Sequence, residues 1–152
     1  MGGQYTGSEL DAEHDAATVN MGGEWRMPTK DEMGELVGNT DHYYIDENGN
    51  ILTKSELDGS INLRSICFVK KSENFDYDNR SNFIEIPFAG LCSGSELIVN
   101  GLYGYIWSRS VLERNMEIAY QLYLDNDGSI DADNSGQYRH CGLSIRGVKN
   151  NY

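Results

Sequence analysis

The chain has 152 residues, of which 39% are hydrophobic and 24% are charged, a length and composition that suit one compact domain over residues 1–152. Its 12 basic and 24 acidic side chains give a net charge of −12, which argues against binding to nucleic-acid phosphate or to an anionic membrane. The apolar runs are shorter than the roughly 18 residues that span a bilayer. The first residues also lack the basic and apolar regions of a signal peptide, so we expect a water-soluble domain without direct membrane insertion.

Two helices are predicted in the N-terminal part of the chain. Ser8 and the acidic residues after it provide a hydroxyl cap and a favourable first turn for a helix over residues 9–19. Thr29, with a glutamate three residues later, has the spacing of a capping box and predicts a second helix over residues 30–37. Gly38 is expected to end this helix in a left-handed conformation.

The rest of the chain is expected to form strands and loops, because short apolar runs alternate with turn-forming residues. Asn48 and Gly49 supply the backbone conformations of a tight turn, which predicts a hairpin around them. A polar loop is expected over residues 70–82. The predicted strands, beginning with the two arms of the hairpin, are residues 43–45, 51–53, 66–69, 83–86, 105–108, 119–124 and 143–146.

The three cysteines, Cys67, Cys92 and Cys141, lack the paired spacing of a zinc site. An odd number agrees either with one disulfide and one free thiol or with three buried thiols. We favour three reduced, mostly buried thiols, because free cysteine is among the most buried residue types.

The aromatic residues divide between core and surface. Trp25 and Trp107 stand next to apolar residues and are assigned to the core. Alternation along a strand places Leu122 and Leu124 on one face and Tyr123 on the other. Tyrosine suits a recognition surface, since it brings a large amphipathic area at a low cost in side-chain entropy.

Five short motifs occur in order along the chain: GGEWRMPTKDE at residues 22–32, IPFAG at 86–90, GLYGYIWS at 101–108, NMEIAYQL at 115–122 and GLSIRGV at 142–148. Together they resemble the bacterial major paralogous domain family over about residues 11–148. Arg109 stands where that family usually has serine. The resemblance implies an α+β domain with a C-type-lectin-like fold, in which two N-terminal helices pack on a twisted, mainly antiparallel sheet with long loops.

The last motif, in which Gly147 follows Arg146, is also similar to the variable proteins of diversity-generating retroelements. The variable proteins are found among the surface proteins of gut bacteria and in phage tail fibres. They display diversified side chains in the stretch that follows the tryptophan-serine strand, which corresponds here to about residues 108–141. The resemblance implies non-enzymatic binding of an unknown protein or carbohydrate ligand on a cell surface, without a cofactor. It also implies an extracellular location, at a cell surface or on a virion.

Two alternatives remain beside this interpretation. One is a secreted surface module that is not diversified. The other is a degenerate enzyme of the formylglycine-generating type, which shares the fold and works through cysteine. Cys92 and Cys141 fall in no matching motif, so we favour a binding module over an enzyme.

The variable proteins also imply which residues form the binding surface. Their mutations fall on template adenines, usually in AAC or AAT codons, so a diversified position can become only a residue whose codon ends in a pyrimidine. Met, Glu, Gln, Lys and Trp cannot arise in this way. The residues excluded from diversification are therefore Glu113, Met116, Glu117, Gln121 and Gln137. An ordinary solvated loop has a similar composition, so a purely structural loop is the alternative. The candidate ligand-binding residues are Tyr123, Asp125, Asn126, Asp127, Ser129, Asp131, Asp133, Asn134, Tyr138 and His140.

Residues 125–131 have the alternating acids and the glycine of a calcium-binding EF-hand loop. Tyr123 and Asn134 stand where that loop needs acidic ligands, so an Asp-Gly hairpin turn is the preferred interpretation. The Glu-Pro-Asn and Gln-Pro-Asp triplets of lectin calcium sites do not occur, and the three histidines fall in no metal-binding or catalytic motif. We therefore expect neither a metal site nor catalytic residues.

Overall fold

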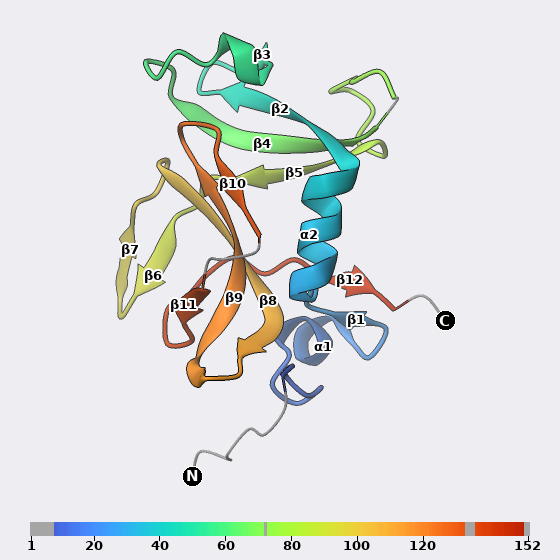
Figure 1. The fold of residues 1–152 in the computed structure, drawn as a ribbon, viewed down its shortest axis with the longest axis vertical. Helices are drawn as coiled ribbons and strands as arrows, with labels where there is room; N and C mark the ends of the chain where they lie inside the picture. Colours follow the sequence, from blue (N-terminus) through green and yellow to red (C-terminus); the bar gives the residue numbers. More distant parts are fainter. Residues whose placement is uncertain (1–7, 72, 133–135, 151–152) are drawn as a thin grey trace.

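A computed structural model describes residues 8–71, 73–132 and 136–150 of the chain. Within these residues it has two α-helices and a mainly antiparallel set of strands, so the α+β class expected from the sequence is confirmed (Figure 1). Neither helix of the described part combines the length and the apolar character that a membrane span requires.

The first helix, α1 (Ala16–Met21), begins later and is shorter than the sequence predicts. Its N-cap is Asp15, whose side chain accepts hydrogen bonds from backbone N–H groups of the first turn. Ser8 is not a helix cap; its carbonyl accepts a hydrogen bond from strand β8 (Tyr103–Leu112), and an antiparallel bridge follows at Glu9. The extended segment there reduces the length available for the helix.

Asp15 connects α1 to the chain that follows it. Its carboxylate is 0% exposed, and both of its oxygens lie 3.0 Å from the N–H of Met27. The Nε of Arg109 lies 3.9 Å from Oδ2 of the same carboxylate. A buried carboxylate is costly unless it is hydrogen-bonded or paired, and these contacts are why the helix begins after Asp15.

The second helix, α2 (Lys30–Asn39), has the predicted capping box. Thr29 Oγ1 accepts from the N–H of Glu32 at 3.2 Å, and the Glu32 carboxylate accepts from the N–H of Thr29 at 2.8 Å. The expectation that Gly38 ends the helix was wrong, because the helix continues into β2 (Thr40–Asp46) without a loop. The first residue of β2 is the C-cap, and its hydroxyl donates to a carbonyl of the last helical turn.

The first sheet has the antiparallel order β3-β2-β4-β5. The predicted hairpin is confirmed between β2 and β3, and Gly49 at its turn has a φ of 87°, which a residue with a side chain rarely adopts. A 3-10 helix (Lys54–Glu56) follows the hairpin. The remaining strands of this sheet are β3 (Ile51–Leu52), β4 (Leu63–Lys70) and β5 (Phe83–Pro87), so the strands predicted at residues 66–69 and 83–86 are confirmed.

The second sheet is built around β9 (Asn115–Asp125), which pairs with β8 on one edge. The short strands β10 (Ile130–Asp131) and β11 (Gly136–Tyr138) both pair with β9, at different points along its length. Two further pairs join β6 (Leu91–Ser93) to β7 (Glu96–Ile98), and β1 (Trp25–Arg26) to β12 (Val148–Lys149).

The prediction of a strand over residues 143–146 was wrong. The chain forms only isolated bridges there, from Gly142 to Cys92 and from Ser144 to Ile106. It crosses from β6 to β8 and does not run along either strand, so no ladder develops until β12.

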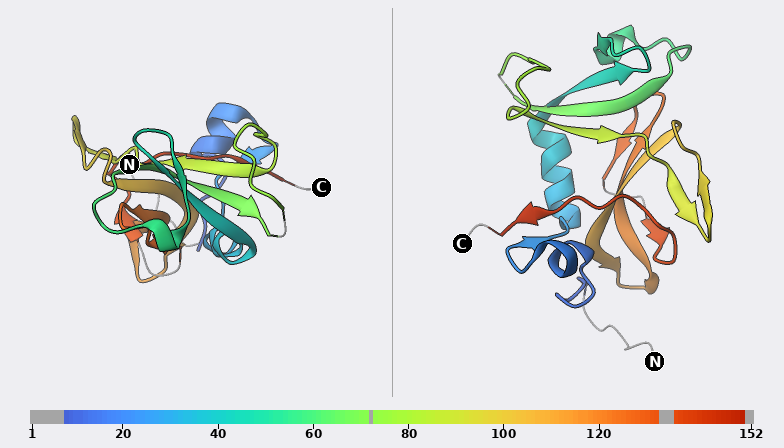
Figure 2. Two further views of the ribbon diagram at one scale, coloured as in Figure 1. Left: turned by 90° about the horizontal axis from the view of Figure 1, so that it is seen from above. Right: turned by 180° about the vertical axis from the view of Figure 1, so that it is seen from behind.

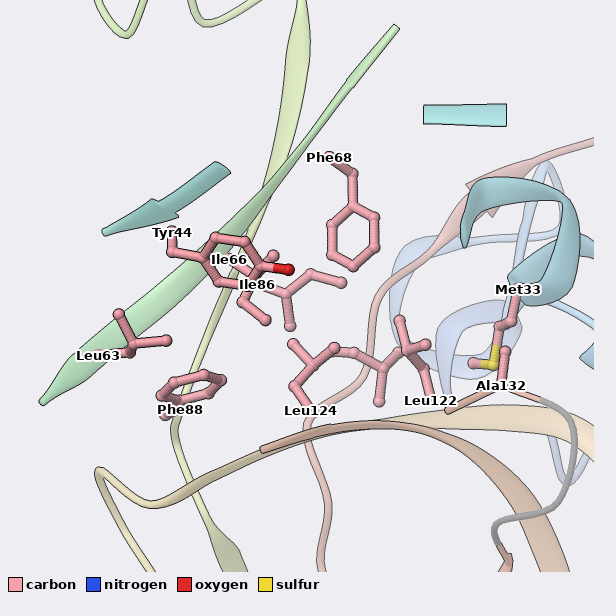
Figure 3. Close-up of a cluster of buried hydrophobic side chains, with 11 residues drawn as sticks. Met33, Tyr44, Leu63, Ile66, Phe68, Ile86, Phe88, Leu122, Leu124 and Ala132 are labelled. Atoms are coloured by element: carbon pink, nitrogen blue, oxygen red, sulfur yellow. The ribbon is translucent and has the colours of Figure 1, made fainter. Parts of the chain in front are cut away.

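The main hydrophobic core lies between α2, the first sheet and β9. Figure 3 shows the side chains of this core, among them Met33, Phe68, Ile86, Leu122 and Leu124. The prediction that the two leucines of β9 share the core face is confirmed.

The two tryptophans are less buried than expected. Both side chains are only partly buried. Trp107 packs at the margin of two smaller hydrophobic clusters, one containing Val111 and the other Tyr105. Trp25 lies on the short β1–β12 pair, where Lys149 Nζ is 5.3 Å from the centre of its ring. A two-stranded pair at the surface covers only one side of an indole, which explains its exposure.

All three cysteines are free thiols, but they are not mostly buried. Cys67 lies inside β4, where burial raises the pKa of its thiol to about 12. Cys92 is exposed and Cys141 is partly buried. The difference arises because β6, which carries Cys92, belongs to a surface hairpin that the sequence analysis did not predict.

We expect Asp15→Ala to lower the free energy of unfolding by about 3 kcal/mol, because it removes charge-assisted hydrogen bonds to three backbone N–H groups in a buried position. Urea denaturation measures this change. Asp11→Ala, which removes an exposed carboxylate from the same segment, should change stability by less than about 1 kcal/mol. Equal effects of the two substitutions would contradict the role given to Asp15.

Protonation of the Glu32 carboxylate should lower the free energy of unfolding in acid. The Arg26 guanidinium hydrogen-bonds to this carboxylate and lowers the pKa of Glu32 from 4.5 to about 2. A lowered pKa contributes stability in full above the unfolded-state value, and this contribution is lost as the pH falls from about 4.5 toward 2. Glu32→Gln should therefore flatten the decrease in unfolding free energy over that range.

Glu35→Gln is the matched control for this experiment, because Glu35 is exposed on the same helix and has no ion pair among the described residues. Its pH profile of unfolding should follow that of the wild-type chain. Parallel wild-type and Glu32→Gln profiles between pH 4.5 and 2 would refute the assignment.

Candidate ligand-binding surface

The candidate residues lie at opposite ends of strand β9. Asp125 pairs with Tyr103 at one end, whereas Ile118 pairs with Tyr138 toward the other. Because a strand rises about 3.3 Å per residue, these two positions are separated by roughly 20 Å. Figure 1 shows β10 and β11 at the two ends accordingly. The structure therefore does not bring all the candidates into one patch.

The first group forms a turn that is attached to the other sheet. β10 folds back on β9 after this turn, so the predicted Asp-Gly hairpin is confirmed. Asn126 Oδ1 accepts from the N–H of Leu63 at 2.7 Å. Lys54 and Tyr44 donate to two carbonyls of the turn, at 2.8 and 3.2 Å. Asn126 thus joins the two sheets, which is a structural role.

Gly128 makes this close contact possible. Its φ is +81°, and a Cβ at this position would lie 2.5 Å from a methyl carbon of Leu57 and 3.0 Å from the ring of Tyr44. A larger residue would therefore push the turn away from the first sheet.

The carboxylates of the turn are engaged locally. Asp125 accepts from the Tyr123 hydroxyl at 2.7 Å, and Asp127 accepts from the N–H of Ser129 at 2.7 Å. Hydrogen bonds from the side chain and backbone of Ser129 lower the pKa of Asp127. Asp131 is partly buried in β10. Within the described part of the chain, no group of three or more His, Cys, Asp or Glu side chains could hold a metal ion.

Two other candidates, Asp133 and Asn134, lie outside the described residues.

Tyr123 packs against other tyrosines. Its ring centre lies 5.5 Å from that of Tyr103 and 5.6 Å from that of Tyr105. Burial and the hydrogen bond to Asp125 raise the pKa of its hydroxyl. It faces away from the main core, as strand alternation predicts, but it contributes to a second cluster and is only partly accessible.

Tyr138 and His140 form the accessible end of the candidate set. Tyr138 is 47% exposed, and its ring stacks on His140 with centres 5.5 Å apart and planes at 24°. Arg139, between them, donates its backbone N–H to the Glu117 carbonyl at 2.8 Å. The pair is therefore exposed while its backbone is tied to β9.

A cavity that the sequence did not predict lies beside this end. Arg139 lines a cavity of about 200 Å³ together with Trp107, Ala119, His14 and Ile145. These residues come from four separate parts of the chain, so their proximity has no local sequence signal. A second cavity, of about 410 Å³, is lined by residues that include Lys30, Arg114 and Tyr120.

A groove of about 610 Å³, which the sequence also did not predict, lies between α2, β5 and the segment that leads to β12. Its walls are largely apolar, and Arg146 is among them. The only signal for it in the sequence was Arg146, a charged residue among the mostly small and apolar residues of the motif GLSIRGV.

Comparisons of the chain with known protein families, with curated proteins and with solved structures found no match.

We expect Asn126→Ala to lower the free energy of unfolding by about 1–2 kcal/mol, because the N–H of Leu63 loses its partner at the contact between the sheets. Tyr138→Ala, at the exposed end, should change it by less than about 0.5 kcal/mol. Urea denaturation of both variants provides the measurement. A larger loss for Tyr138→Ala would reverse the two roles.

Proposed function

We propose that this chain is a non-enzymatic module that binds a protein or carbohydrate ligand on a cell surface, with a C-type-lectin-like fold. In this proposal it is a variable protein of a diversity-generating retroelement, located at a bacterial surface or on a phage tail. The observation that carries the proposal is the exposed Tyr138–His140 stack on a backbone that is tied to β9.

Tyr138 and His140 are exposed, whereas strand β9, to which their backbone is tied, is largely buried, and this difference in exposure favours a diversified surface. Gln121, which the codon rule excludes from diversification, is 5% exposed on β9, and the adjacent Leu122 is 1% exposed in the main core. Tyr138 and His140 both satisfy the codon rule and contribute to no core cluster. Substitution at these two positions would change the surface and leave the core intact.

Stacked aromatic rings suit the proposed ligand classes. An exposed tyrosine provides both a flat apolar face and a hydroxyl, and it loses little side-chain entropy on binding. The C-type-lectin-like fold is supported by the order of the five motifs and by the position of α2, which contacts strands of both larger sheets.

Sequencing the locus across isolates tests the proposal. We expect substitutions to concentrate at Tyr138 and His140, whereas Asn126 stays constant because it connects the two sheets although its codon permits change. A reverse-transcriptase gene and a near-copy of the 3′ coding segment should lie nearby. Variation spread evenly along the chain would favour an undiversified surface module.

A further inference from the structure

The groove between α2, β5 and the segment leading to β12 has the properties of a small-molecule site. Its volume of about 610 Å³ lies within the range of roughly 300–1,000 Å³ that is typical of such sites. The right-hand view of Figure 2 shows the elements that border it. Met33, Ile86 and Leu122, which are buried members of the main core, also line the groove.

Arg146 provides a positive charge in the wall of this groove. Its side chain is exposed, and its Nη1 donates to the backbone carbonyl of Glu85 at 3.3 Å. Partial desolvation lowers the pKa of the guanidinium. Arg26, Arg80 and Arg109 each have a carboxylate partner. Over the described residues, no carboxylate lies within ion-pair distance of Arg146.

The other charges around the groove leave this cation available. Glu32, on the helical wall, is already hydrogen-bonded to Arg26 through both carboxylate oxygens. Glu35 is exposed at the surface of α2, where solvent screens its charge. Lys149, on the same segment as Arg146, also lines the groove, and its Nζ lies 3.9 Å from a carboxylate oxygen of Glu24. Arg146 is therefore the cation that the C-terminal segment presents to a ligand, beside the apolar side chains of the groove.

We propose that this groove binds a medium-chain aliphatic carboxylate, with the chain on the apolar floor and the carboxylate on the Arg146 guanidinium. Arginine suits this role because its planar donors match the two oxygens of a carboxylate. An anionic lipid surface would bring many negative charges against a chain of net charge −12, whereas one carboxylate brings a single charge, so we assign the site to a free molecule in solution. This site lies outside the proposed Tyr138–His140 surface and does not depend on its function.

Calorimetric titration of the whole chain with decanoate, below its micellar concentration, tests the proposal. We expect saturable binding with one site per chain. Affinity should rise roughly fourfold per methylene from hexanoate to decanoate, as the floor buries more of the chain. Decanol, which offers no charge to Arg146, should bind at least tenfold more weakly than decanoate.

Substitution of Arg146 separates recognition from general electrostatics. Arg146→Gln should reduce the affinity for decanoate at least tenfold and leave that for decanol unchanged. Arg146→Lys, which keeps the charge, should recover part of the loss. Arg114→Gln is the matched control, because it removes one positive charge from an exposed arginine that lines a different cavity.

Any of three titration results would overturn the proposal. They are a lack of saturable decanoate binding, equal affinities for decanoate and decanol, and equal losses from Arg146→Gln and Arg114→Gln. Backbone amide shifts in NMR spectra also locate the ligand. Shifts at Leu36 and Ile84 support the groove, whereas shifts restricted to Tyr138 and His140 would refute it.

Discussion

Strand β9 is covered on both faces, and this constraint determines where the other segments lie. Leu122 and Leu124 contact the core formed with α2 and the first sheet. Ala119 and Tyr123, on the opposite face, belong to two other clusters, with the N-terminal segment and with β6. A strand with both faces buried leaves little accessible side-chain surface along its length. The exposed residues of the proposed recognition surface therefore lie beyond its central part, as at Tyr138.

Charged side chains, in addition to the apolar cluster around Leu10, attach the N-terminal segment to this framework. Asp15 joins α1 to Met27 through buried hydrogen bonds. Arg26 pairs with Glu32 at the start of α2, and its Nε donates to the Asn150 side chain at 2.7 Å. The start of α2 and the C-terminal strand are thus connected through one arginine. Such contacts depend on pH and on exact geometry, unlike the main core.

The two proposed binding regions differ in how they are connected to the hydrophobic core. Tyr138 and His140 are exposed side chains on a backbone tied to β9, so their identities can change without disturbing the core. The groove shares Ile86 and Leu122 with the main core, so its shape depends on residues that also determine stability. The proposed variable surface and the proposed groove site can therefore coexist in one domain, because different residues form them.

The sequence by itself determined the features that depend on neighbouring residues. The capping box of Thr29 and the turns at Gly49 and Gly128 are confirmed, because each needs only local spacing or a positive φ. The strand predicted at residues 119–124 follows from alternating polar and apolar residues and lies within β9.

Tertiary structure alone decided the rest. Asp15 is the helix cap because its carboxylate also reaches the N–H of Met27, 12 residues further on. Asn126 became a structural residue because the distant Leu63 meets it, and Arg146 entered a groove whose walls come from α2 and β5. Hydrogen-bond partners and cavities of this kind arise from the meeting of remote segments, which residue spacing does not encode.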